Sequence, residues 1–426
     1  MNVLIIAGRG NTGCGDVRMA IEIEDYFKEN GDFVKVIEGF DKPWTRPHAQ
    51  GELDWIKHKF LTNPFVDTIN YDMCLITSVT PINVNKDRDK ANLIFENFLN
   101  TIRSLRDKGT RIVYLQCDNK INSINRNFYA LEEFKDSFFE LLDRVIVHNV
   151  NADFVKKFID KKVSPNHKFT IGQQVLISTD FDEVKSIIKD SPKIDKTCWF
   201  IGRSAQWKGW REFRDLHTNV LKDAGWLSVI EGIELSINAK QDLCNVDENN
   251  HYTWRDDALY YQKGRFNTPV EEVLDNADTY RHMPILIYGP YNRVEALNRV
   301  HRSKFGMFFT YTGPEFGGQI EITFLEIVGA GTVPVIRKEL WEHAYFNDTY
   351  LKDLGSPEDL GIVVWDEIDT LNKLNEDEDL YNEYLRRALT FCKSQFDRKY
   401  IIKRLIDKCN SNKDEVKRKM QEISLF

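Results

Sequence analysis

Short apolar runs rich in β-branched residues alternate along this chain with longer segments in which apolar residues recur at helical spacing. Such alternation predicts βαβ units, in which helices connect the strands of a parallel sheet. In the N-terminal part, strands are predicted at residues 3–7, 33–37, 73–77, 111–116 and 144–148. Helices are predicted at residues 16–30, 87–108, 131–142 and 152–161.

A second series of the same kind follows a polar segment at residues 179–196. Its predicted strands are residues 197–201, 226–231, 284–288, 307–311, 333–336 and 362–365, and a helix is predicted at 210–221. A single hydrophobic core stops growing near about 250–300 residues. We therefore expect an α/β protein with two doubly wound, Rossmann-like domains. The expected boundaries are 1–180, 190–395 and, for C-terminal helices that cross back to the first domain, 396–426.

Charge and cysteine content narrow the class of protein. A formal net charge of −8 and a pI near 5.7 argue against a protein that coats nucleic acid by bulk attraction, although they leave room for a local basic cleft. No apolar run approaches the roughly 18 residues that span a bilayer, and the apolar start is too short for a signal peptide. The seven cysteines are scattered without a CxxC pair, which is typical of free thiols in a reducing cytosol. We expect a soluble protein in the cytoplasm.

A glycine-rich loop, GRGNTG at residues 8–13, follows the first predicted strand and precedes a helix capped by Asp16. Its GxGxxG pattern would let the backbone approach a phosphate or a sugar closely. With Glu38 after the second strand, the pattern also fits an NAD-binding fingerprint. We favour a tight strand-to-helix turn over NAD binding, because the second half of the chain carries the better anion-binding features.

Two cations lie in the stretch CWFIGRSAQWKGW, residues 198–210, after the first strand of the second series. The planar guanidinium of Arg203 can hold two phosphate oxygens, and Lys208 adds a point charge near the start of the next helix. In open α/β sheets, ligands bind at the carboxyl ends of the strands. The pattern fits a diphosphate, and the alternative is an exposed loop that merely carries an arginine and a lysine.

A second glycine-rich segment, TGPEFGGQIE at residues 312–321, follows the strand predicted at 307–311 and opens a helix. We expect Glu321 and Glu326 to lie on this helix, where a separation of five residues places their side chains about 140° apart in projection. A carboxylate beside a phosphate repels the ligand unless it accepts hydroxyl hydrogens. We therefore assign Glu326 to the nucleotide ribose and Glu321 to the donor sugar, the alternative being solvated glutamates on a helix face.

The pattern PEFG…LE…GAGTVPVI resembles the donor-nucleotide helix of GT-B glycosyltransferases. In many of these the two glutamates are eight residues apart, and the corresponding position here is Gly318. The chain is more similar to the T-even phage α-glucosyltransferases that modify 5-hydroxymethylcytosine in DNA. The matching blocks are an altered ARGxxGCG at residues 7–15, DKPWTR at 41–46, VYLQCD at 113–118, RNFYALEE at 126–133, WFIGRSAQWKGW at 199–210, VIEGIE at 229–234 and IEITFLEIVGAGTVPV at 320–335.

This resemblance implies a GT-B fold, with the two domains facing across a cleft, the N-terminal domain holding DNA and the C-terminal domain a UDP-sugar. It implies transfer of glucose from the UDP-sugar to 5-hydroxymethylcytosine in duplex DNA, with retention of the anomeric configuration; a pentose such as arabinose is the alternative that the departure at Cys117 raises. It also implies a monomer, without a membrane partner, in the cytoplasm of an infected bacterium, and it implies no metal. The donor residues carried over are Gly13, Gly15, Arg203, Lys208, Glu231, Gly318, Glu321 and Glu326.

Asp118 is the catalytic residue that the resemblance implies. It follows the strand predicted at 111–116, where a carboxylate could take the proton of the attacking hydroxymethyl group. A phosphate oxygen of the departing UDP is the alternative base. The family carries histidine immediately before this aspartate, whereas this chain has Cys117, which exchanges hydrogen bonds with a sugar hydroxyl poorly. That departure bears on which sugar is transferred.

A base inside duplex DNA is reached by extruding its nucleotide, which calls for phosphate-binding cations and an aromatic plug. The predicted DNA contacts are Trp44, Arg46, Lys120 and Arg126. A solvated basic loop is the alternative reading of these residues. Two further functions stay open: a GT-B enzyme that acts on a saccharide or another small acceptor, and a noncatalytic binding protein that has kept the architecture.

Overall fold

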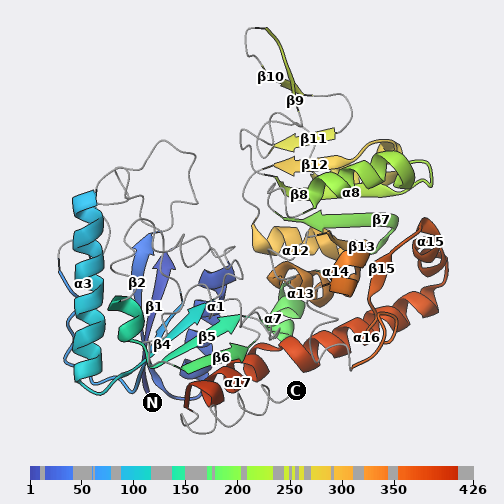
Figure 1. Ribbon diagram of the computed structural model, residues 1–426. Helices are drawn as coiled ribbons and strands as arrows, with labels where there is room; N and C mark the ends of the chain where they lie inside the picture. Colours follow the sequence, from blue (N-terminus) through green and yellow to red (C-terminus); the bar gives the residue numbers. More distant parts are fainter. Residues whose placement is uncertain are drawn as a thin grey trace. The chain divides into compact units, whose positions relative to one another are not determined.

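The computed structural model contains two compact units, each built around its own sheet (Figure 1). Met1–Ser178 and Arg398–Phe426 belong to the first unit, and Thr179–Pro314 and Gly318–Asp397 form the second. The structure describes residues 1–9, 15–41, 60, 63–77, 88–116, 137–148, 170–174, 178–202, 209–233, 244–248, 252–254, 259–262, 270–288, 292–309, 321–343 and 354–410. Within these residues, no helix combines the length and the apolar character needed to cross a membrane.

The first unit has a six-stranded parallel sheet with the strand order β2-β1-β3-β4-β5-β6. The chain passes from β1 through a helix to β2 on one side and then continues with β3 on the other side of β1. The strands are β1 (Asn2–Arg9), β2 (Phe33–Asp41), β3 (Met73–Ile76), β4 (Arg111–Gln116), β5 (Arg144–His148) and β6 (Thr170–Gln174), and the long helices are α1 (Gly15–Glu29) and α3 (Arg88–Asp107).

Buried clusters cover both faces of this first sheet. On one face, Leu4 belongs to a cluster that includes Phe98 of α3. On the other face, Val3 belongs to a cluster that includes Ile23 of α1. Helices cover both faces of the sheet, so neighbouring residues of a central strand, which point to opposite faces, are both buried and both apolar. This explains the unbroken apolar runs in the sequence.

The C-terminal helix α17 (Arg398–Asn410) completes the second of these clusters. Ile402 and Leu405 are buried in it beside α1. Arg398, whose side chain is 8% exposed, donates from Nη2 to a carboxylate oxygen of Glu29 at 2.7 Å. The last described helix thus packs on a helix formed almost four hundred residues earlier in the chain.

The second unit has a seven-stranded sheet with the strand order β11-β12-β8-β7-β13-β14-β15, and all its neighbouring strands are parallel. Its strands are β7 (Ile194–Ile201), β8 (Leu227–Ile233), β11 (Leu259–Gln262), β12 (Ile285–Tyr288), β13 (Ser303–Phe308), β14 (Val333–Arg337) and β15 (Val363–Trp365). Its helices are α7 (Phe181–Ile187), α8 (Trp210–Leu216), α10 (Val270–Asp275), α11 (Ala277–Tyr280), α12 (Arg293–His301), α13 (Ile322–Gly329), α14 (Lys338–His343), α15 (Ile368–Glu376) and α16 (Glu378–Phe396). Two parallel sheets flanked by helices confirm the predicted α/β class.

Aromatic side chains dominate the core of the second unit. Trp199 of β7 is fully buried on one face of the sheet, and Phe200 lies in the cluster on the other face. In that second cluster the rings of Trp226 and Phe305 lie 5.5 Å apart between centroids. The indole of Trp226 also donates to Asn372 of α15 at 3.0 Å, which satisfies its buried N–H group.

Several elements differ from the sequence predictions. The predicted helix at 210–221 is α8 followed by one π-helical turn, η3 (His217–Leu221). Strands β6 and β11 were not predicted, nor was the separate antiparallel pair β9 (Cys244–Val246) and β10 (Tyr252–Trp254). Helices α16 and α17 are separated by Asp397, whose φ of −59° and ψ of 136° are not helical.

Candidate functional site

The chain reverses its direction of winding between β7 and β13 of the second sheet. From β7 it proceeds to β8 on one side, and β13 later pairs with the opposite side of β7. In open α/β sheets, ligands bind outside the carboxyl ends of the strands at such a reversal. The loops that leave these two carboxyl ends, residues 203–208 and 310–320, carry Arg203, Lys208 and Gly318. All three residues lie outside the described parts of the chain.

The described ends of these two loops meet. Gly209, the residue before α8, has a φ of +75°, which glycine adopts at little cost. A Cβ atom at this position would lie 1.9 Å from the carbonyl oxygen of Phe309. On the other side of the first loop, the N–H group of Gly202 donates to the carbonyl oxygen of Glu231 at 3.0 Å. The first loop therefore ends against the residue from which the second loop begins.

Helix α13 begins immediately after the second loop. Glu321 is its N-cap, with an extended backbone (φ −98°, ψ 161°), and its carbonyl oxygen accepts from the N–H group of Phe324 at 3.0 Å. The prediction that Glu321 lies on the helix is therefore wrong, and the 140° projection does not apply to its side chain. The helix lies tight on β13, because a Cβ atom at Gly306 would lie 2.0 Å from Ile327 Cγ2.

Glu326 lies in the second turn of α13, and its carboxylate is paired. Arg293 donates from Nε to Glu326 Oε1 at 2.5 Å and from Nη1 to Glu183 Oε1 at 3.1 Å. The Glu326 side chain is 12% exposed. The carboxylate thus reaches the protein surface only in part and is held from one side by a cation.

Glu231 occupies a different environment, inside the sheet. Its side chain is 1% exposed, and the guanidinium of Arg299 donates to both of its carboxylate oxygens. Burial raises the pKa of the Glu231 carboxyl, and the contact with Arg299 opposes that shift. The predicted donor contact of Glu231 stays a prediction, and in the described structure this carboxylate fixes α12 to β8.

Sequence reasoning missed the two arginines of α12 that pair with these glutamates, Arg293 and Arg299. One signal was present, because Glu231 stands within the apolar run VIEGI, and a buried carboxylate requires a cation or several hydrogen-bond donors. Nothing in the sequence indicated which cation that would be.

The first unit offers the same kind of edge at β1, since β2 and β3 lie on opposite sides of it. There β1 ends at Arg9 and α1 begins at Gly15, so the glycine-rich loop joins a strand to a helix as predicted, but Asp16 lies inside the helix and is not its cap. The other predicted residues of this unit lie outside the described residues. They are Gly13, Trp44, Arg46, Asp118, Lys120 and Arg126.

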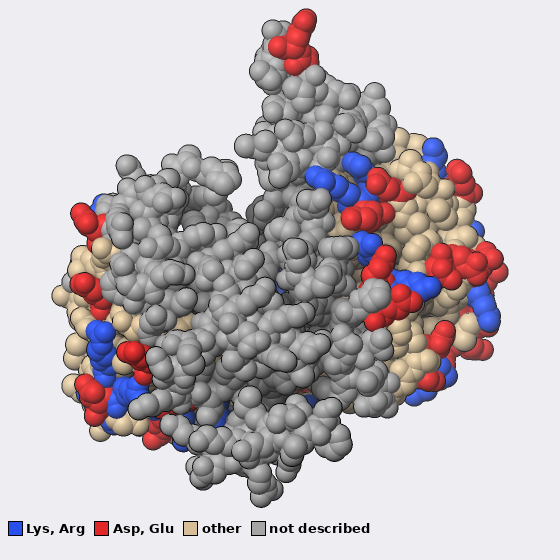
Figure 2. Space-filling view, in the orientation of Figure 1, with Lys and Arg blue, Asp and Glu red and all other residues tan. Residues whose placement is uncertain are grey.

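Over most of the described surface in view in Figure 2, Lys and Arg lie among Asp and Glu, whereas the tip at the top of the view shows only acidic side chains. Elsewhere on the second unit in this view, Lys and Arg alternate with Asp and Glu, and no stripe of one sign forms among them. Within the described residues, no group of three or more His, Cys, Asp or Glu side chains is arranged to hold a metal ion.

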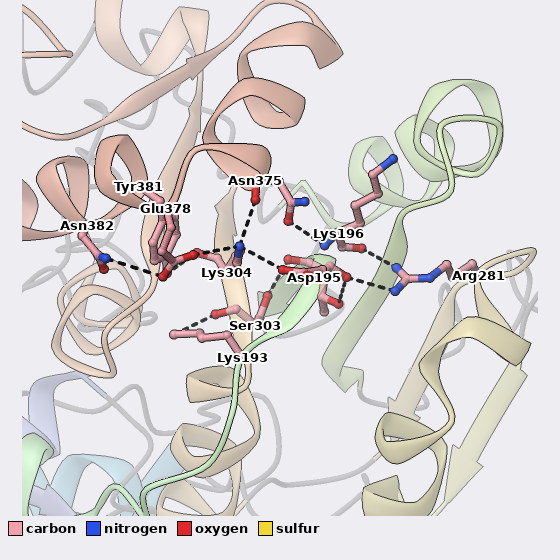
Figure 3. Close-up of polar contacts among 11 residues, drawn as sticks. Lys193, Asp195, Lys196, Arg281, Ser303, Lys304, Asn375, Glu378, Tyr381 and Asn382 are labelled. Atoms are coloured by element: carbon pink, nitrogen blue, oxygen red, sulfur yellow. Dashed lines mark hydrogen bonds and ion pairs between the residues drawn. The ribbon is translucent and has the colours of Figure 1, made fainter.

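A polar cluster lies at the opposite, amino edge of the second sheet (Figure 3). The ammonium of Lys304, which starts β13 with Ser303, lies 2.9 Å from Asp195 and 3.3 Å from Glu378. Lys193 donates to the carbonyl oxygen of Ser303 at 2.9 Å, and burial lowers the pKa of Lys193 to about 7. Because these groups pair with one another, we assign this edge to stability and the carboxyl edge to ligand binding.

Comparisons with known proteins show what this chain is similar to. A family model described as DNA alpha-glucosyltransferase matches residues 14–383. The DNA alpha-glucosyltransferase of Enterobacteria phage T4 is 25% identical over 442 aligned positions, which cover 96% of this chain and 99% of that protein. A solved alpha-glucosyltransferase in complex with UDP-glucose and abasic DNA has a TM-score of 0.70 at 24% identity, over 96% of this chain and 100% of that one. A solved structure described as trehalose-6-phosphate from E. coli bound with UDP-2-fluoro glucose has a TM-score of 0.53 at 10% identity. The match covers 97% of this chain and 99% of that one.

Proposed function

Because the chain belongs to the DNA alpha-glucosyltransferase family, we propose that it transfers glucose from UDP-glucose to the hydroxymethyl group of 5-hydroxymethylcytosine in duplex DNA. The observation that carries the proposal is the family match over residues 14–383, which includes both loops of the candidate site. The fold is the α/β fold of GT-B glycosyltransferases. Related alpha-glucosyltransferases have been solved with UDP-glucose and with DNA that contains an HMU base, which supports both the donor and the kind of acceptor.

The donor site in this proposal is the carboxyl edge between β7 and β13. Arg203 and Lys208 neutralise the diphosphate, while the backbone at Gly318 approaches it closely. The contact between Gly209 and Phe309 supports this assignment, because it joins the loops that carry these residues. The roles assigned to the two halves of the chain are proposals of the same standing: residues 1–180 hold DNA, 190–395 hold the donor, and 396–426 complete the first half.

Carboxylates of the site bind sugar hydroxyls in this proposal. Glu326 accepts from the ribose and Glu321, at the mouth of α13, accepts from the transferred glucose. Gly13 and Gly15 are assigned donor contacts in this proposal, because glycine lets a backbone approach a ligand closely. Each contact matches charge or hydrogen-bonding capacity to a group that UDP-glucose carries.

In the reaction, the hydroxymethyl oxygen of the cytosine forms a bond to the anomeric carbon of glucose. The bond from that carbon to the UDP oxygen breaks, and UDP leaves with the electron pair. The hydroxyl proton goes to the Asp118 carboxylate or to a phosphate oxygen of UDP. We propose that the new bond forms on the face that UDP leaves, so that the anomeric configuration is retained.

Trp44, Arg46, Lys120 and Arg126 hold the DNA in this proposal, the cations on phosphates and the indole near the extruded base.

Incubating the protein with labelled UDP-glucose tests the function directly. We expect label in duplex DNA containing 5-hydroxymethylcytosine and none in the same duplex with cytosine. Label in free saccharides but not in DNA would replace the proposal with a small-acceptor enzyme, and binding without any transfer would indicate a noncatalytic protein.

Cys117 makes labelled UDP-arabinose a necessary second donor in that experiment. Faster transfer from UDP-arabinose than from UDP-glucose would keep the reaction class and change the sugar.

The catalytic base has its own test in Asp118→Asn, which keeps the size of the side chain and removes the base. We expect unchanged UDP affinity and a kcat lower by roughly 10²- to 10⁴-fold, the usual contribution of a positioned base. Unchanged kcat would assign the proton to the donor phosphate.

A further inference from the structure

Three helices of the second unit share one ion cluster beside the candidate donor site. Arg293 of α12 lies between Glu326 of α13, at 2.5 Å, and Glu183 of α7, at 3.1 Å. The exposed fractions are 17% for Arg293, 12% for Glu326 and 38% for Glu183. The pair of Arg293 with Glu326, the proposed ribose ligand, is therefore more buried than the pair of Arg293 with Glu183.

The position of Arg293 in its own helix is electrostatically unfavourable. It is the first residue of α12, after the N-cap Asn292, whose Oδ1 accepts from the N–H groups of Val294 and Glu295. The N-terminus of a helix carries a partial positive charge and favours anions over cations. Pairing with the two carboxylates offsets this cost. The contacts of Arg293 with Glu326 and Glu183, rather than its place in the helix, therefore explain why a cation is found here.

The contact leaves Glu326 suited to bind a further donor. The Nε–H group of Arg293 occupies Oε1, and a carboxylate has about four lone-pair directions in all, so Oε2 keeps capacity for hydroxyl hydrogens. An unpaired glutamate side chain samples many rotamers, and ordering it on ligand binding costs affinity. The hydrogen bond from Arg293 already restricts that freedom.

We propose that Arg293 is a positioning residue that holds Glu326 in the rotamer that accepts from the ribose hydroxyls, and that this pair sets the preference for a ribonucleotide donor over its deoxyribonucleotide counterpart. The proposal rests on the proposed function, specifically on the ribose contact of Glu326.

Calorimetric titration of UDP and of 2′-deoxy-UDP tests it, with the full-length protein and its Arg293→Met and Arg293→Lys variants. For the unaltered protein we expect UDP to bind roughly tenfold or more tightly than 2′-deoxy-UDP, as for a hydrogen bond to a charged group. In Arg293→Met, UDP affinity should fall by roughly tenfold while 2′-deoxy-UDP affinity changes by less than about twofold. Lysine keeps the charge without the planar fork, so Arg293→Lys should lose part of the preference.

Arg302→Met is the matched control. Like Arg293, Arg302 is 17% exposed and pairs with a carboxylate, Asp275, at 2.7 Å. It is the C-cap of α12, whereas Arg293 is the first residue of the helix. We expect it to leave the ratio of the two affinities unchanged. Thermal unfolding of each variant separates loss of the fold from loss of the preference, and Arg293→Lys decides the question if Arg293→Met does not fold.

The outcomes separate the two proposals. Equal weakening of both nucleotides, or an unchanged ratio in the folded Arg293 variants, would reduce Arg293 to a structural role and overturn the inference. If the unaltered protein binds UDP and 2′-deoxy-UDP equally, the ribose contact of Glu326 fails. If it binds neither, the proposed donor fails as well.

Discussion

Gly209 lies against Phe309, where the ends of the two loops of the candidate donor site meet. Only glycine fits at this position. Its φ of +75° and the 1.9 Å that would separate a Cβ atom from Phe309 O act together, since each alone penalises a side chain. Other residues pay about 1–2 kcal/mol for left-handed backbone. A clash with a backbone oxygen adds to this cost, because the backbone on both sides is fixed by strands and a helix.

We therefore expect Gly209→Ala to lower the free energy of unfolding by more than about 2 kcal/mol and to weaken UDP binding. Gly225→Ala is the control, because Gly225 has nearly the same φ, +76°, and a Cβ atom at that position would have no neighbour within 4 Å. It should cost only about 1–2 kcal/mol and leave UDP affinity unchanged. Urea unfolding and calorimetry measure both quantities, and equal effects of the two substitutions would contradict the importance of the Phe309 contact.

His217 gives the stability of the second unit a dependence on pH. It is fully buried in η3, its Nδ1 lies 2.9 Å from Ser228 Oγ, and burial lowers its pKa to about 4. The unfolded chain binds a proton near pH 6.5 and the folded chain only near pH 4, so stability is lost as pH falls between these values.

The expected loss is up to about 3 kcal/mol between pH 6.5 and pH 4. His217→Asn should flatten this part of the curve. Urea unfolding at a series of pH values measures the effect. A curve that keeps its slope in His217→Asn would assign the pH dependence to other groups.

Helix α12 is the element that brings both site arginines to their glutamates, and its start depends on Asn292. Removing a side-chain cap costs about 1 kcal/mol. We expect Asn292→Ala to destabilise the protein by that amount and to loosen Arg293, the next residue. Asn292→Asp keeps a side-chain oxygen that can cap the helix, so it should cost less. Chemical denaturation of both variants checks this, and equal costs would contradict a capping role.

Elements with apolar runs could be predicted from the sequence, whereas those without them could not. Strands β4 and β5 begin and end where they were predicted, because both faces of each are buried. Strand β6, TIGQQ, contains a single large apolar residue, and β9 and β10 have three residues each, too few to show a period. At the break between α16 and α17, apolar residues continue at helical spacing on both sides of Asp397.

Only those features of the candidate site that depend on residues close together in the sequence could be predicted. The loops after β7 and β13 were located because a glycine-rich segment after a strand marks a ligand edge in α/β proteins. The pairing of Glu326 with Arg293 could not be foreseen, since it requires the packing of three helices distant in sequence. The start of α13 one residue after Glu321 was equally out of reach, because helix starts vary by one or two residues in any such prediction.

For the molecule as a whole, the acidic net charge of −8 makes salt dependence an informative test of DNA binding. If Arg46, Lys120 and Arg126 contact phosphates, log affinity should fall with log salt concentration by about 0.9 per contact, which amounts to a loss of tens-fold between about 50 and 200 mM salt. Fluorescence anisotropy with a labelled duplex measures the slope.

Lys120→Ala should reduce that slope by about one, while replacement of the exposed Lys185 in α7 should leave it unchanged. An affinity that does not vary with salt would exclude a groove that follows the phosphate backbone.

The packing of α17 on α1 has a consequence for how the protein is made. Ile402 and Leu405 fill the same cluster as Val3 and Ile23, so residues almost four hundred positions apart in the sequence share one core. While the ribosome is still adding the second unit, the nascent first unit keeps an apolar face open to solvent. Its core is complete only after α17 has been synthesised, and a chain that lacked α17 would leave that face as a surface for chaperones and proteases.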